Sequence, residues 1–206
     1  MKSKALYLEM AKAHLLESAN LKQRLSEEGV GSIVDAAYLI TAAFNSGNKL
    51  LLCGNGGSAA DCQHLAAEFV NRLTSDIERQ GLPALALTTD TSFLTAYAND
   101  YGFDGIFKRQ VETFGKTGDV LLCISTSGNS PNVLYAAEAA RSLGMKIVAL
   151  VGKGGKLVEI SDVVISAPSG SVQYIQEAHL AIEHILCDLV ERILFNKPVT
   201  HLSERS

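Results

Sequence analysis

His64 and Glu68 stand four residues apart in the stretch "CGNGGSAADCQHLAAEF", residues 53–69. On a helix, residues i and i+4 share one face and lie about 6 Å apart. An imidazole and a carboxylate held side by side are suited to moving protons on a bound ligand. An isolated histidine on an apolar helix is more often a hydrogen-bonded core residue, so both interpretations stay open for the pair alone.

The glycines that precede this pair predict an anion site. Gly54, Gly56 and Gly57 follow a short apolar run, and Asn55 and Ser58 supply polar groups where a helix is expected to begin. Backbone N–H groups at a glycine loop and a helix start together favour a phosphate. The loop lacks both the GxGxxG spacing and the GK[ST] ending, which disfavours a nucleotide cofactor. A tight strand-to-helix turn is the structural alternative.

A second polar loop, "STSGNS" at residues 125–130, follows another apolar run and leads into Pro131, a favoured first residue of a helix. Hydroxyl groups donate hydrogen bonds to a phosphate, and no lysine or arginine is present in the loop. Such a neutral cradle suits a sugar phosphate that must leave after turnover. The alternative role of Ser130 is a helix cap. The hydroxyls of the cradle belong to Ser125, Thr126, Ser127 and Ser130.

The last long apolar segment, at about 171–195, predicts a central helix or a subunit interface, in which polar residues need partners. Its polar residues include Gln176, Glu177, His179, Glu183 and His184. His184 is favoured for a site because its neighbours are strongly apolar, and His179 is its rival.

A nitrogen and oxygen set of His64, Glu68, Gln176 and His184 is acceptable to zinc. Gln176 and His184 stand about 12 Å apart along a straight helix, so joint ligation requires an irregular helix or two subunits. A further polar turn, in "YANDYGFDGIF" at 97–107, offers Asn99 and Asp100 to sugar hydroxyls, or as an ordinary helix cap.

These groups need a scaffold that brings the ends of apolar runs together. Apolar residues at helical spacing predict two helices, at 4–27 and about 32–47, before the first strand. Strands and helices then alternate, which favours a parallel sheet with helices on both faces and ligands beyond the carboxyl ends of the strands. The strands are predicted at 49–54, 83–88, 119–125, 146–152 and 162–168, and the later helices at 57–73, about 103–115, 131–144 and about 171–195.

Composition excludes several classes of protein. The chain has 206 residues, 47% hydrophobic and 19% charged, and a net charge of −4, which suits one globular domain without the basic surface of a nucleic-acid binder. Charges interrupt the first 25 residues every few positions, unlike a signal peptide or a membrane span. Four isolated cysteines fit reduced thiols. We therefore expect a cytoplasmic protein that binds no membrane and no nucleic acid.

The stretches "CGNGGSAADCQHLAAEF", "AND", "ISTSGNSPNV" and "IQEAHLAIEHILCDLVE" closely resemble the sugar isomerase (SIS) family, and within it the phosphoheptose isomerases. The resemblance covers a single domain, residues 1–195, and leaves 196–206 as a tail. It implies a three-layer α/β/α sandwich around a five-stranded parallel flavodoxin-like sheet, with additional N-terminal helices. It also implies a homotetramer with sites at subunit interfaces.

The resemblance further implies conversion of sedoheptulose 7-phosphate to D-glycero-D-manno-heptose 7-phosphate, the start of the bacterial route to ADP-heptose for lipopolysaccharide. Glu68 and His184 match the family's acid/base pair, and the hydroxyl loop matches its phosphate cradle. Positions that match substrate contacts are Asn55, Gly56, Gly57, Asn99, Asp100 and Gln176. Positions that match zinc ligands are His64, Glu68, Gln176 and His184.

Two other functions remain open from the sequence. One is a non-catalytic relative that uses the same fold to bind a replication-initiator partner; such relatives depart at the catalytic positions, whereas Glu68 and His184 are present here. The other is an isomerase or sensor for a different sugar phosphate, because the loops alone do not distinguish six carbons from seven.

Overall fold

The computed structural model describes residues 4–195, so the predicted tail at 196–206 lies outside the described residues. Its centre is a five-stranded sheet in the order β2-β1-β3-β4-β5, in which every neighbouring pair is parallel. The five predicted strands are confirmed. They are β1 (Leu50–Gly54), β2 (Ala84–Ala86), β3 (Val120–Ser125), β4 (Lys146–Val151) and β5 (Val163–Ser166).

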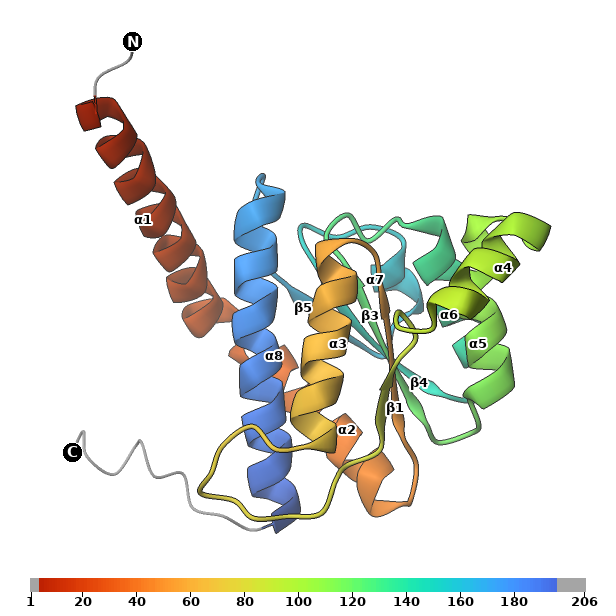
Figure 1. Ribbon diagram of the computed structural model, residues 1–206. Coiled ribbons are helices and arrows are strands. Elements are labelled where there is room, and N and C mark those ends of the chain that lie inside the picture. The colour runs from red at the N-terminus through yellow and green to blue at the C-terminus, as the bar shows by residue number, and fades with distance from the viewer. Residues whose placement is uncertain (1–3, 196–206) are drawn as a thin grey trace.

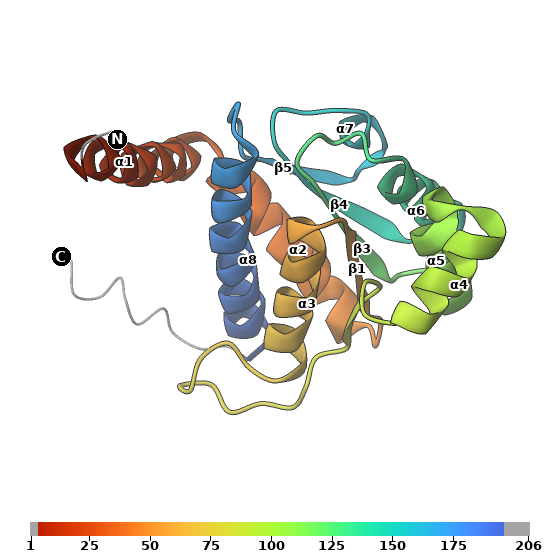
Figure 2. The same ribbon diagram turned by 45° about the horizontal axis from the view of Figure 1, so that its top comes forward.

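Helices cover both faces of the sheet, which confirms the predicted three-layer α/β/α architecture (Figures 1 and 2). One face is covered by α2 (Val30–Asn45), α3 (Gly57–Val70) and α8 (Val172–Phe195). The other is covered by α5 (Ile106–Phe114) and α6 (Pro131–Ser142), with the short α7 (Leu157–Ile160) and the 3-10 turn η1 (Phe103–Gly105) nearby.

The side chains of each strand point alternately to the two faces of the sheet, so the core is divided between the two helical layers. Leu50 and Leu52 of β1 pack toward α2, α3 and α8, whereas Leu51 and Cys53 pack toward α5 and α6. Successive side chains of a strand point to opposite faces, so a strand buried on both faces reads as a continuous apolar run. Strands β1 and β3 are buried throughout, and the strand order places their carboxyl ends side by side at the sheet edge.

The first helix, α1 (Lys4–Glu28), extends away from the sheet and approaches the other elements through its last turns (Figure 1). Leu21 and Leu25 are buried there. Several large apolar side chains farther up the helix are exposed: Leu6, Tyr7, Leu8, Met10, Leu15 and Leu16. Within residues 4–195, no helix is long and apolar enough to cross a membrane.

The prediction of a polar turn at Asn99 and Asp100 is wrong, because both residues lie in the last turn of a helix, α4 (Thr91–Tyr101). The Asp90 carboxylate accepts a hydrogen bond from Phe93 N at its start, and Gly102, with φ of 92°, ends it. No α4 residue is fully buried. Its core-facing stripe is short and only partly buried, consisting of Leu94, Tyr97 and Ala98, so the apolar period is weak and this element was missed.

Candidate active site

The first glycine loop brings backbone close to backbone at the end of β1. A Cβ on Gly54 would stand 2.8 Å from the Ser58 carbonyl oxygen, and Gly56 has φ of 56°. A Cβ on Gly57 would stand 2.4 Å from Nε2 of Gln176, so the Gln176 amide lies against the first turn of α3. The loop therefore presents open N–H groups and one side-chain amide at a helix start, as a phosphate site requires.

The hydroxyls of the second loop converge at the neighbouring strand end. Ser125 Oγ lies 3.1 Å from Ser130 Oγ and 3.5 Å from Ser127 Oγ. Ser130 makes no side-chain capping bond to α6, so the capping role considered for it is not seen. The three hydroxyls bond to one another, with Asn129 N donating to Ser127 Oγ, and they gather at one point of the strand end.

An amide pair that the sequence analysis missed joins the two loops. Asn55 Nδ2 donates to Asn132 Oδ1 at 2.8 Å, and Asn132 Nδ2 donates to Asn55 Oδ1 at 2.9 Å. Asn132 is 2% exposed. It stands second in α6, where asparagine looks ordinary, and only the pairing of β1 with β3 brings it to Asn55. The pair fixes the first loop against the second.

Glu68, His64 and His184 meet between α3 and α8, which lie side by side on one face of the sheet (Figures 1 and 2). His64 Nε2 lies 2.8 Å from His184 Nε2 and 3.8 Å from Glu68 Oε1. The side chains of His64 and Glu68 keep 40% and 22% of their exposure. The predicted carboxylate and imidazole thus share one accessible cluster, two to three turns of α3 beyond the first loop.

The zinc set fits this arrangement only in part. The facing nitrogens of His64 and His184 are donors that zinc prefers. Gln176, however, lies beside Gly57, about 12 Å along α8 from His184. In the part of the chain that the structure describes, no three histidine, cysteine, aspartate or glutamate side chains are grouped to hold a metal. One chain therefore offers the two imidazoles but not the four predicted ligands together.

The remaining polar residues of α8 either contact another helix or are buried in the core. Glu177 accepts a hydrogen bond from His14 of α1 at 2.7 Å. Glu183 is fully buried, and burial, together with the negative charge of Asp61, raises its pKa to about 8. His179, the rival of His184, is also fully buried, and its Nε2 lies 3.1 Å from the Val151 carbonyl oxygen. His179 is thus a core residue.

Burial lowers the pKa of His179 to about 4, and this predicts acid sensitivity. The unfolded chain, with a histidine pKa of 6.5, binds the proton more tightly than the folded chain does. The stability that the buried neutral imidazole contributes is therefore fully present above pH 6.5 and is lost as the pH falls toward 4. His179→Gln keeps a donor for Val151. The difference in unfolding free energy between wild type and H179Q is expected to shrink by about 2 kcal/mol from pH 7 to pH 5 in denaturant titrations. A difference that stays constant would contradict the buried neutral state.

A third glycine loop, between β4 and α7, is locked onto the hydroxyl loop. Gly152 N donates to the Thr126 carbonyl oxygen at 3.1 Å, and Leu157 N donates to that of Gly128 at 3.0 Å. Lys156 N donates to the Asn129 side chain at 3.0 Å. The hydroxyl loop thus gains its rigidity from the next strand connection.

Gly128→Ala is expected to disrupt this interlock. Gly128 has φ of 64°, and a Cβ there would stand 2.0 Å from the Gly154 carbonyl oxygen, so backbone must move. We expect a loss of about 2 kcal/mol in unfolding free energy and weaker phosphate binding. Gly31→Ala, where a Cβ meets nothing within 4 Å, is the control. Equal melting temperatures and equal phosphate affinities for the two variants would contradict the interlock.

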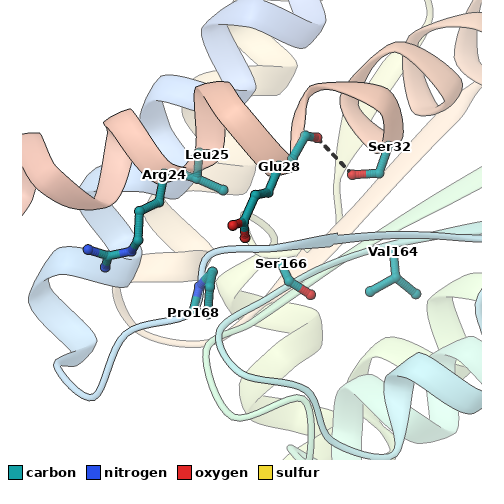
Figure 3. A pocket seen from close by; sticks show the side chains of 8 residues that line it. Arg24, Leu25, Glu28, Ser32, Val164, Ser166 and Pro168 are labelled. Atoms are coloured by element: carbon teal, nitrogen blue, oxygen red, sulfur yellow. Dashed lines mark hydrogen bonds between the residues drawn. The ribbon is translucent and has the colours of Figure 1, made fainter.

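Two surface hollows are lined by predicted site residues, and a third is not. One of about 500 Å³ adjoins Thr126 and Ser127. Another, of about 560 Å³, is lined by His184 together with Leu73 and Leu189. A third, of about 280 Å³, lies between the end of α1 and β5, where Glu28 points toward Ser166 and Pro168 (Figure 3), and no predicted site residue lines it.

Two predicted substrate contacts, Asn99 and Asp100, make no hydrogen bond to either loop in the part of the chain that the structure describes. Asn99 Nδ2 donates to Asp100 Oδ1 at 2.9 Å, and both side chains are exposed on α4. The described residues make no hydrogen bond from either side chain to the loops or to Glu68. The structure thus brings Gln176 against the first glycine loop and Glu68 near His184 through His64, and it leaves Asn99 and Asp100 exposed on α4.

Comparison with known proteins identifies the family of the chain. The SIS domain family matches residues 14–152. A phosphoheptose isomerase of Geobacter sp. (strain M21) is 52% identical over 191 residues, covering 92% of this chain and 98% of that protein. The structure of a phosphoheptose isomerase from Neisseria gonorrhoeae has a TM-score of 0.85 at 44% identity, with 90% of this chain and 98% of that one covered. One from Francisella tularensis has a TM-score of 0.86 at 37% identity, with the same coverage.

The matches span nearly the whole length of these relatives, and the matching chain carries the loops and the α3–α8 cluster described above. This chain belongs to the SIS domain family and, within it, to the phosphoheptose isomerases, which are aldose–ketose isomerases.

Proposed function

We propose that this enzyme converts sedoheptulose 7-phosphate to D-glycero-D-manno-heptose 7-phosphate, with Glu68 and His184 as its acid/base groups. One observation carries the proposal. Glu68 lies 3.8 Å from His64, which lies 2.8 Å from His184, and this accessible cluster stands between α8 and the helix that begins at the first glycine loop, α3. The phosphate and the reacting carbons of one sugar phosphate thus have separate places.

The chemistry needs one proton moved between two carbons and one between two oxygens. The Glu68 carboxylate removes the proton from C1 of the ketose while His184 donates a proton to the C2 oxygen, giving an enediol. Glu68 then returns its proton to C2, and His184 takes the proton from the C1 hydroxyl as the aldehyde forms. No oxidant or reductant is consumed, and both groups end in their starting states.

The loops hold the far end of the substrate. Hydroxyls of Ser125, Ser127 and Ser130, with the N–H groups of the first loop, donate to the phosphate oxygens. The Asn55–Asn132 pair keeps the two loops in register. Fixing the phosphate in this way orients the reacting carbons, which is a large part of catalysis by positioning.

Zinc is part of the proposal, with His64 and His184 as its ligands in this chain, and Glu68 and Gln176 as the further predicted ligands. An atom of Glu68 or His184 that held the ion would carry no proton, so proton transfer would use the second oxygen or nitrogen of the same side chain. When bound, the ion would polarise the oxygens of the sugar. The partial fit supports a site completed by another subunit, because Gln176 and His184 of one straight helix do not reach a common point. The proposed assembly is the homotetramer, and the exposed apolar residues of α1 support it.

The location and the pathway are proposed as well. A cytoplasmic enzyme is supported by its four free and buried cysteines, Cys53, Cys62, Cys123 and Cys187. Its product would enter the synthesis of ADP-heptose for lipopolysaccharide.

The proposal is tested by offering purified enzyme sedoheptulose 7-phosphate, fructose 6-phosphate and arabinose 5-phosphate, and following interconversion by NMR. Turnover confined to the seven-carbon sugar supports it. Faster turnover of a shorter sugar would favour the isomerase of another sugar phosphate, and no turnover of any would favour a binding protein. A parallel series with chelator and added zinc tests the metal.

A further inference from the structure

The hydroxyl loop contains no cation that could pair with the negative charge of a bound phosphate. A phosphate ester carries about two negative charges at pH 7, since its second pKa lies near 6. The groups that converge on it from Ser125, Ser127 and Ser130 are neutral. Hydroxyls and helix N-termini offer a dianion only partial positive charge, so a full cation nearby strengthens its binding.

The structure places one cation beside this loop. The hollow of about 500 Å³ is lined by Thr126 and Ser127 on one side, and by the third glycine loop and the start of α8 on the others. Lys153 is the one charged residue among those of 4–195 that line it. Its Nζ lies 3.9 Å from the point where a Cβ on Gly170 would stand, so the side chain reaches toward the residues before α8.

The surroundings of Lys153 keep its charge available. No carboxylate lines the hollow, and within the described chain Lys153 takes part in no ion pair. Its backbone is held in place because the adjacent Gly152 N donates to the Thr126 carbonyl oxygen. The lysine is therefore positioned by the hydroxyl loop, although it stands 27 residues after Thr126 in the chain.

We propose that Lys153 is a further substrate-binding residue that pairs with the phosphate dianion and selects phosphorylated sugars. This inference rests on the proposed function for the identity of the substrate, but the ligand chemistry, a phosphate oxygen, does not depend on the sugar. A single exposed and flexible ammonium raises affinity for the phosphate while allowing release after turnover.

The test compares Lys153→Gln with Lys156→Gln. Lys156 belongs to the same loop but does not line the hollow. We expect K153Q to raise the KM for the sugar phosphate and the dissociation constant for inorganic phosphate by about tenfold, with kcat nearly unchanged. The wild-type affinity should fall with added salt more steeply than that of K153Q. Lys153→Arg should restore most of the affinity.

The inference is overturned if K153Q and K156Q bind inorganic phosphate equally well by calorimetry and have equal KM values. A fall in kcat at unchanged phosphate affinity would also overturn it, since that would assign Lys153 a role other than phosphate binding. Failure of the proposed function looks different: the wild type would then leave the heptose phosphate unchanged while K153Q still bound inorganic phosphate more weakly.

Discussion

Glu68→Gln is expected to lower kcat for isomerisation by about 10²- to 10⁴-fold, the contribution typical of a positioned general acid/base group. Glutamine keeps the size of the side chain and its place beside His64 but has no carboxylate to take a proton from carbon. The KM is expected to change little, because the phosphate is held by separate loops. Turnover by NMR and the exchange of solvent deuterium into the sugar carbons both measure the loss.

The matched control is Glu112→Gln. Glu112 is also paired at i,i+4, with Lys108, at 3.8 Å on an exposed face of α5. Its variant should retain full activity. Zinc content is measured alongside, because Glu68 is also a predicted ligand. Near-normal turnover and deuterium exchange in E68Q, at unchanged zinc content, would remove Glu68 from the mechanism.

The sheet and its covering helices could be predicted because burial on both faces leaves a plain signal. The strand Val120–Ser125 is apolar up to its final serine, and α8 keeps a wide apolar stripe. Helix α4 could not be predicted, because it has no buried residue to set a period. Its contact with the core is limited to the partly buried side chains of Leu94, Tyr97 and Ala98.

Within the site, groups that are contiguous in the sequence could be predicted and groups that depend on strand order could not. The glycine loop, the hydroxyl loop and the His64–Glu68 pair each lie in one short stretch. Asn132 and Lys153 reach the loops only because β1, β3 and β4 are neighbours in the sheet. The same geometry separates Gln176 from His184 within one chain, a separation that the helical rise already indicated.

Arg79→Ala is expected to lower the unfolding free energy by about 3–5 kcal/mol, because it leaves a buried carboxylate without its charge partner. The side chains of Arg79 and Glu191 are both fully buried, and Arg79 Nε donates to Glu191 Oε1 at 2.7 Å. The guanidinium also donates to the carbonyl oxygens of Glu68 at 2.9 Å and Phe69 at 2.8 Å. It therefore ties the end of α3, the loop before β2 and α8 together. Denaturant titration at pH 7 measures the loss.

Arg72→Ala is the matched control, because the Arg72–Glu78 pair lies in the same loop but is exposed, and its loss should cost at most about 1 kcal/mol. Removing both charges with Arg79→Met and Glu191→Leu should recover part of the stability, though not the bonds to the carbonyls of α3. Since one of those carbonyls belongs to Glu68, the double variant should stay folded yet turn over more slowly than wild type. Equal losses for R79A and R72A would contradict this buried clamp between α3 and α8.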